Sequence, residues 1–187
     1  NVGVGTLGGP VETSEAEWDR VLDTNLKSVF LTCKHVLPAM ERQGAGAIVN
    51  CSSVGAGRFS GAYPLAAYGA SKGGVNALTR AIAMQYAAKG IRANAIMPGL
   101  IDTPMAVDDP ARRLGVERAR LARIRSETVP MRRMGEAWDV AYAALFLAIP
   151  LLIEEARARF GEERARDALP FLFLYPVGFF LAAVYTE

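Results

Sequence analysis

Tyr68 and Lys72 are the two residues whose types and spacing most directly suggest chemistry. They are four positions apart in a helical pattern, so both side chains project from one helix face, one turn apart. A free phenol has a pKa of about 10. A lysine cation about 6 Å away would stabilise the phenolate by about 2–3 kcal/mol at an effective dielectric constant of about 20. That lowers the phenol pKa by about two units, so the pair is predicted to act as a general acid/base.

Taken alone, the spacing of Tyr68 and Lys72 is better explained by a half-buried tyrosine near an unrelated surface lysine. Two further polar residues in unusual places, however, accompany this pair. Ser53 lies fifteen residues before Tyr68, just past a buried strand, and its hydroxyl could hydrogen-bond a substrate oxygen. The alternative for Ser52 and Ser53 is a simple strand-to-loop transition. Asn25 lies in the middle of a predicted helix, a poor place for Asn. It is predicted either to bend the helix and hold a water or to tolerate solvent there.

A loop that begins at Pro98 and Gly99 and contains Thr103 and Pro104 is a further candidate, because such a loop can offer backbone N–H groups to a carboxamide. His35, the only histidine, falls on the first predicted helix and is expected to be a surface or satisfied residue. No metal-ligand cluster is found, so no metal site is predicted.

The elements that must position these residues alternate in type along the chain. A helix begins at the capping box of Ser14 and Glu17 and ends near Gly44. A strand buried on both faces, a long helix, a second strand and a further helix follow, at residues 47–51, 65–89, 91–97 and 136–149. This order favours an α/β fold with an open parallel sheet. In such sheets ligands bind at the carboxyl ends of the strands, which here precede Ser52 and Pro98.

Residues 106–133 are rich in arginine. One interpretation is a solvated helix with a loop. The sharper alternative is a mobile lid over the substrate, whose pocket would be lined by residues 54–64 and 105–133.

Composition narrows the class of protein. At 187 residues, the chain is expected to form one domain with a real core. The net charge of +2 gives no reason to propose nucleic acid as a partner. The two cysteines form no CxxC pattern, so a reducing compartment, and therefore a cytoplasmic location, is expected.

These motifs jointly resemble the classical short-chain dehydrogenase/reductases. Asn1, Val2 and Gly3 resemble the Asn-Ala-Gly that follows the fourth strand of that family. The family's catalytic tetrad is matched in order by Asn25, Ser53, Tyr68 and Lys72. Its nicotinamide-side loop is matched by Pro98, Gly99, Ile101 and Thr103. Its next helix is resembled by residues 133–135 followed by residues 146–148. The resemblance runs from Asn1 to about Ala148 and implies a Rossmann-like doubly wound parallel sheet.

The resemblance implies an NAD- or NADP-dependent oxidoreductase that interconverts a secondary alcohol and a ketone. Tyr68 would give or take the proton, Ser53 would orient the substrate oxygen, and Lys72 would lower the tyrosine pKa and hold the nicotinamide ribose. Asn25 would keep a water in the proton relay. The residues expected to bind the cofactor are Asn1, Gly3, Tyr68, Lys72, Pro98, Gly99, Ile101 and Thr103. The 53–68 loop is about two residues longer than usual, which leaves Ser52 as an alternative to Ser53. A homodimer or homotetramer formed through the Tyr68 helix and the preceding helix is expected.

The sequence also departs from that family. It contains no Gly-rich dinucleotide fingerprint, and the first three strands with their helices would need about 80 more residues. The first residue is Asn1, and the usual last strand is missing. We therefore expect a fragment with a partial catalytic domain over residues 1–149 and an atypical helical tail over residues 150–187. The NAD or NADP preference would be set in the missing part.

The tail carries a run of 19 uncharged residues, 168–186, which is long enough to span a bilayer but equally consistent with a buried apolar segment. Residues 171–187 are similar to a segment of GPI-type membrane mannosyltransferases. These features leave an alternative function open: an inactive fragment or binding module, associated with a membrane through this segment.

Overall fold

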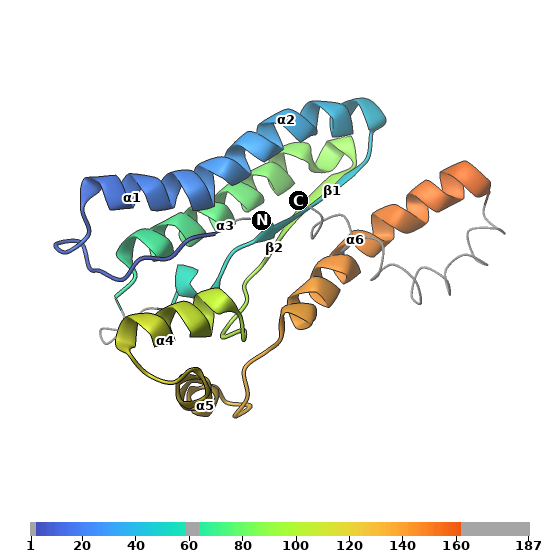
Figure 1. Ribbon diagram of the computed structural model, residues 1–187. Coiled ribbons are helices and arrows are strands. Elements are labelled where there is room, and N and C mark those ends of the chain that lie inside the picture. Colours follow the sequence, from blue (N-terminus) through green and yellow to red (C-terminus); the bar gives the residue numbers. More distant parts are fainter. Residues whose placement is uncertain (1–2, 59–63, 162–187) are drawn as a thin grey trace. The chain divides into compact units, whose positions relative to one another are not determined.

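The computed structural model describes residues 3–58 and 64–161 (Figure 1). Two strands and a set of helices form the part of the chain that carries the candidate residues. Strands β1 (Gly46–Cys51) and β2 (Ile91–Ile96) pair in parallel, with Gly46 opposite Ile91 and Cys51 opposite Ile96. The predicted β-α-β order and parallel pairing are confirmed.

The first predicted helix is interrupted once. Its α1 part (Glu15–Leu22) begins where the Ser14 hydroxyl accepts a hydrogen bond from the Glu17 N–H at 3.2 Å, as the capping box predicted. A π-helical turn (Asp23–Lys27) follows, and α2 (Ser28–Gln43) continues to Gly44. The turn contains Asn25, so the interruption falls at the residue that was predicted to disturb the helix. Such π turns often mark functional positions.

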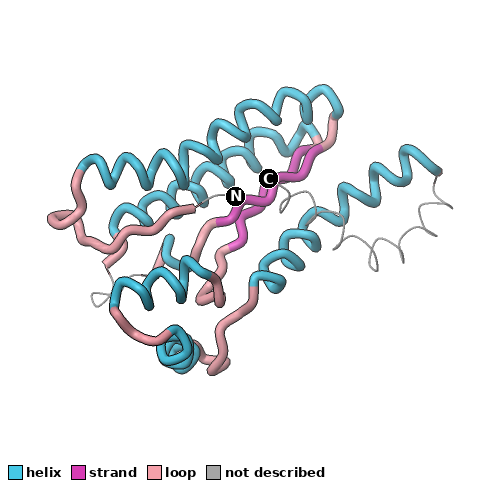
Figure 2. Tube along the Cα trace, viewed as in Figure 1, coloured by secondary structure: helices cyan, strands magenta, loops and turns pink. Residues whose placement is uncertain are grey.

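Helix α3 (Ala66–Tyr86) connects the two strands and carries Tyr68 and Lys72. Together with α2 it packs on the strands, as the tube in Figure 2 shows. The apolar cluster between them comprises Cys33, Leu37, Ile48, Ile82 and Ile91. Side chains of β1 alternate between buried and half-buried, so the prediction that this strand is buried on both faces is wrong for the described residues. The reason is that α2 and α3 share the face to which Ile48 belongs.

The arginine-rich segment forms a π turn (Pro104–Asp108), α4 (Asp109–Leu114) and α5 (Arg118–Thr128). Most of its arginine side chains are exposed. Only Val107, Pro110, Ala111 and Leu121 are buried in these three elements. The segment is therefore attached to the rest of the chain by few apolar contacts.

Helix α6 (Ala137–Phe160) is longer than predicted, because it continues through Pro150. Proline removes one N–H donor from a helix, but the residues on both sides are good helix formers such as Ala, Leu, Glu and Arg. The chain divides into two compact units, residues 1–147 and 148–187. None of the helices within the described residues is both long and apolar enough to cross a bilayer. The uncharged run 168–186 lies outside the described residues.

The starts of the two strands approach each other so closely that Gly90 cannot be replaced without strain. Gly44 and Gly90 both have left-handed backbone angles, with φ of 68° and 72°. A β-carbon on Gly44 would meet no atom within 4 Å, whereas one on Gly90 would lie 2.2 Å from the Gly44 carbonyl oxygen.

We expect Gly44→Ala to lower the free energy of unfolding by about 1–2 kcal/mol, the cost of a left-handed alanine. Gly90→Ala should lower the free energy of unfolding by about 3 kcal/mol or more. Its added methyl group would clash with the Gly44 carbonyl oxygen and push the starts of the two strands apart. Urea unfolding of both variants measures the difference. Equal losses would contradict the close approach described here.

Candidate active site

The carboxyl ends of the two strands lie together, as expected for a parallel pair. Backbone pairing continues past the strands, because the Ser52 N–H donates to the Ile96 carbonyl at 2.8 Å and the Val54 N–H donates to the Pro98 carbonyl at 3.0 Å. The loop after β1 is thereby held against the loop after β2. Ser53 lies between these two bonds and therefore stands at the junction of both loops.

Ser53 and Tyr68 are brought together at this junction. Their side chains are hydrogen-bonded, and the Ser53 hydroxyl also accepts the Gly55 N–H at 3.0 Å. A β-carbon on Gly55 would lie 3.3 Å from both the Ser53 Oγ and the Tyr68 Cε1, so this glycine packs against both side chains. Sequence reasoning did not single out Gly55.

Ser52 has a different environment from Ser53. It is buried, and its hydroxyl donates to the Lys72 carbonyl at 3.0 Å within the packed interface between β1 and α3. The two adjacent serines therefore differ in kind: Ser53 adjoins the Tyr68 side chain, and Ser52 is occupied by the backbone of α3.

Burial raises the pKa of Tyr68, and the hydrogen bond with Ser53 offsets part of that rise. The predicted lowering of this pKa by Lys72 is wrong for the structure. The Lys72 Nζ lies 5.9 Å from the Tyr68 ring centroid, close to the predicted separation, but it donates a hydrogen bond to the Cys51 carbonyl at 2.8 Å. Desolvation of the phenol has the largest effect on this pKa, so the net change is upward. Burial also lowers the pKa of Lys72 itself.

Asn25 is fully buried, and its side-chain amide joins two parts of the chain. Its Oδ1 accepts the Val4 N–H at 2.8 Å and its Nδ2 donates to the Val4 carbonyl at 2.8 Å. The same Nδ2 donates to the Ser71 hydroxyl at 3.0 Å, and that hydroxyl donates to the Tyr68 carbonyl at 2.7 Å. Asn25 therefore holds the N-terminal segment against α3, and the interpretation that it merely tolerates solvent is wrong.

Ser71 is a component of this network that sequence reasoning missed. It is fully buried in the second turn of α3. The available signal was a small polar residue directly before Lys72, but serine in that position is too common to identify a site.

At Gly3 and Gly5 the backbone of the N-terminal segment passes beside the catalytic candidates. A β-carbon on Gly3 would lie 3.7 Å from both the Asn25 Oδ1 and the Lys72 Nζ, and one on Gly5 would lie 3.9 Å from the Tyr68 Cδ2. Asn1, which was also predicted to bind the cofactor, lies outside the described residues.

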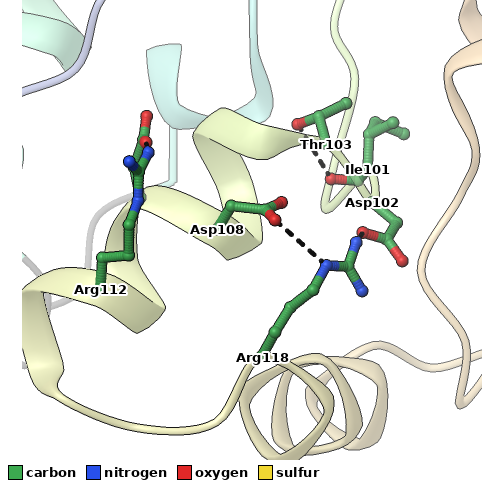
Figure 3. A network of polar contacts seen from close by, with 7 residues as sticks. Ile101, Asp102, Thr103, Asp108, Arg112 and Arg118 are labelled. Atoms are coloured by element: carbon green, nitrogen blue, oxygen red, sulfur yellow. Dashed lines mark hydrogen bonds and ion pairs between the residues drawn. The ribbon is translucent and has the colours of Figure 1, made fainter.

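The loop after β2 is held by strand-like bonds to Gly135. The Gly135 N–H donates to the Leu100 carbonyl at 2.9 Å, and the Asp102 N–H donates to the Gly135 carbonyl at 2.8 Å. These bonds fix Ile101 and leave Thr103 at the start of the following π turn, with its hydroxyl 3.4 Å from the Ile101 carbonyl (Figure 3).

These residues fit the nicotinamide half of a dinucleotide. Lys72 supplies an ammonium, Thr103 a hydroxyl, and Gly99 a backbone around which a β-carbon would meet no atom within 4 Å. Open backbone of this kind allows a planar ring and its carboxamide to approach closely. Within residues 3–58 and 64–161, no group of three or more His, Cys, Asp or Glu side chains could hold a metal ion.

Comparison with known proteins supports the same assignment. A family model described as enoyl-(acyl carrier protein) reductase matches residues 1–153. The chain is 43% identical over 145 residues to the 2-(R)-hydroxypropyl-CoM dehydrogenase of Xanthobacter autotrophicus, an alignment that covers 75% of this chain and 53% of that protein. The chain spans about half the length of the curated relatives it matches.

Solved structures agree in fold. A short-chain dehydrogenase/reductase of Burkholderia xenovorans superposes with a TM-score of 0.74 at 44% identity, covering 86% of this chain and 59% of that one. A 2-deoxy-D-gluconate 3-dehydrogenase of Agrobacterium tumefaciens, solved with bound NADP, gives a TM-score of 0.66 at 36% identity, covering 79% and 57%.

These matches cover the residues that carry the tetrad. They lend no support to the resemblance of residues 171–187 to membrane mannosyltransferases, and they do not favour an inactive fragment or binding module. With a family model matching residues 1–153 and relatives of this identity, the chain belongs to the short-chain dehydrogenase/reductase family.

Proposed function

We propose that the protein is an NAD- or NADP-dependent oxidoreductase that interconverts a secondary alcohol and a ketone. The observation that carries this proposal is the Ser53–Tyr68 hydrogen bond at the joined carboxyl ends of the strands, one helical turn from the buried Lys72. A nicotinamide bound at the loop after β2 would exchange a hydride with the substrate carbon. The chain itself would exchange the proton at the substrate oxygen.

Tyr68 is the proton donor in the reducing direction. Because burial raises its pKa, the phenol is protonated at neutral pH and ready to donate to a carbonyl oxygen that gains negative charge. The O–H bond of Tyr68 breaks as the substrate O–H bond forms, which leaves a phenolate. In the oxidising direction the same phenolate takes the proton from the alcohol.

Ser53 and Lys72 assist this transfer from two sides. The Ser53 hydroxyl adjoins the phenol and can hydrogen-bond the same substrate oxygen, which orients it and stabilises developing charge. The Lys72 ammonium is poised to stabilise the phenolate once it forms and to hold the ribose of the nicotinamide. Asn25 is assigned a relay water by the family resemblance, and its bonds to Val4 and Ser71 add a positioning role.

The cofactor would lie along residues that surround this centre. We assign its nicotinamide half to Gly3, Tyr68, Lys72, Pro98, Gly99, Ile101 and Thr103, together with Asn1 on the resemblance alone. The Agrobacterium relative that was solved with NADP supports NADP as one of the two cofactors to be tested.

A homodimer or homotetramer would bury apolar side chains that α1, α2 and α3 leave exposed. Trp18, Phe30 and Leu31 are 40–47% exposed, and Met84 is 83% exposed. We propose association through these helices, in a reducing compartment in which Cys33 and Cys51 form no disulfide.

Tyr68→Phe in the full-length protein should lower kcat by about 10²–10⁴-fold, because the phenyl ring keeps the packing but cannot transfer a proton. Cofactor affinity, measured by the fluorescence of the reduced nicotinamide, should change much less. Tyr86→Phe is the matched control, since Tyr86 lies on the same helix and packs against the apolar cluster. Unchanged turnover in the Tyr68 variant would refute the assignment.

Ser53→Ala should move the ascending limb of the pH profile of alcohol oxidation, on which activity rises with pH, to higher pH. The hydrogen bond from Ser53 lowers the Tyr68 pKa, so its loss raises that pKa further and the active phenolate forms later as pH increases. The kcat/KM profile reports this shift, accompanied by a loss of about 10-fold or more.

Ser52→Ala is the matched comparison. It should leave the ascending limb of the alcohol-oxidation profile in place. Instead it should lower the free energy of unfolding by about 1 kcal/mol, because it removes a buried hydrogen bond to α3. A shifted limb in the Ser52 variant and not in the Ser53 variant would reverse the assignment of the two serines.

A further inference from the structure

Helix α5 is held in place mainly by polar contacts. Among its eleven residues only Leu121 is buried, and Ile124 is 47% exposed. Apolar burial normally fixes the position of a helix of this length. Since α5 buries so little apolar surface, the charged groups that connect it to its surroundings decide where it lies.

Arg118, the first residue of α5, makes the connection that spans most elements. Its Nη2 pairs with Asp102 Oδ1, and its Nε lies 3.4 Å from Asp108 Oδ1 (Figure 3). Asp102 lies between Ile101 and Thr103 in the loop after β2, which we call the cofactor-side loop because it holds several of the proposed nicotinamide contacts. Asp108 ends the π turn. One guanidinium therefore joins the loop, the turn and the helix.

A second arginine of α5 reinforces this arrangement. Arg125 Nη1 donates to the Ala106 carbonyl, inside the same π turn. Isolated exposed ion pairs contribute little to stability, but a planar guanidinium that meets two carboxylates fixes direction as well as distance. We define Arg118, Asp102 and Asp108 as the Arg118 latch.

The charges of the latch argue against a different role, the capture of an anionic ligand by Arg118. Two carboxylates face one guanidinium, so the cluster carries net negative charge. A cation in the first turn of a helix opposes the helix dipole, and the two carboxylates offset that cost. Arg112, by contrast, is 76% exposed, pairs only one turn back with Asp109, and extends away from the latch in Figure 3.

The latch also forms one side of a cavity. A space of about 570 Å³ is lined by Pro104, Asp108, Ala111, Arg112, Gly115, Val116 and Arg118. One of the lining residues, Pro104, directly follows Thr103 of the cofactor-side loop in the sequence. The position of Arg118 therefore influences the shape of a space that adjoins the proposed nicotinamide site.

We infer that Arg118 is a positioning residue that holds α5 and the π turn against the cofactor-side loop and so sets the shape of the adjoining cavity, to which we assign the substrate. This inference rests on the proposed function for the identity of the cavity's ligand. The mechanical part, that Arg118 orders residues 102–128, does not depend on it.

The first test compares amide hydrogen exchange of residues 102–128 in Arg118→Ala and Arg123→Ala. Arg123 is an exposed arginine of the same helix for which no ion pair occurs among the described residues. We expect exchange in this segment to become about 10-fold faster in the Arg118 variant and to stay unchanged in the control. Raising the ionic strength should speed exchange in the wild type and have little further effect in Arg118→Ala. Equal exchange in the two variants overturns the latch.

The second test measures coupling to the site by steady-state kinetics in the full-length protein. Arg118→Ala should raise KM for the substrate about 10-fold while kcat changes less than about 2-fold, because binding is weakened and proton transfer is untouched. The charge-reversed pair Arg118→Glu with Asp108→Arg should recover part of the loss. Faster exchange with unchanged KM overturns the coupling to the site.

These outcomes remain distinct from a failure of the proposed function. If Tyr68→Phe keeps wild-type turnover, the proposed chemistry fails, yet the exchange comparison still tests the latch. If only the exchange and KM predictions fail, the chemistry stands and Arg118 is an ordinary surface residue.

Discussion

Parallel pairing of β1 and β2 is the interaction on which the site depends. The backbone bonds do not stop at the strand ends but continue through Ser52 and Val54 to the carbonyls of Ile96 and Pro98. Two loops that are more than forty residues apart in the sequence are thereby held in contact. Ser53 lies on one loop, and four of the proposed nicotinamide contacts, Pro98, Gly99, Ile101 and Thr103, lie on the other. The pairing therefore sets how far Ser53 lies from that part of the proposed cofactor site.

A buried polar network then fixes α3 on this frame. Asn25 satisfies both backbone groups of Val4 and reaches Ser71, Ser52 bonds the Lys72 carbonyl, and the Lys72 ammonium bonds the Cys51 carbonyl. Buried polar groups are costly unless partnered, and partnered groups permit few alternative arrangements. The network therefore restricts the positions of Tyr68 and Lys72 more tightly than apolar packing alone would.

Tyr68 illustrates how burial and charge compete in this centre. A lysine at the expected separation does not lower the phenol pKa here, because removal of the phenol from water has the larger effect and the ammonium is directed at a carbonyl. A protonated phenol suits donation to a ketone. In the proposed reaction the Ser53 hydroxyl has two effects, since it adjoins the proposed position of the substrate oxygen and limits the rise in the Tyr68 pKa.

The sequence by itself determined the helix start at Ser14, the two strands, the helix between them and the grouping of Ser53 with Tyr68, because capping, periodicity and strand order are local or topological properties. The tertiary structure alone decided which groups each side chain meets. Only in the folded chain does Lys72 bond the Cys51 carbonyl, Ser52 bond the backbone of α3, and Ser71 and Gly55 contact the site residues. The continuation of α6 past Pro150 and the pairing of Arg118 with Asp102 and Asp108 were likewise not predicted. Desolvation and long-range hydrogen bonding depend on atoms distant in the chain, and no local pattern encodes their final distances.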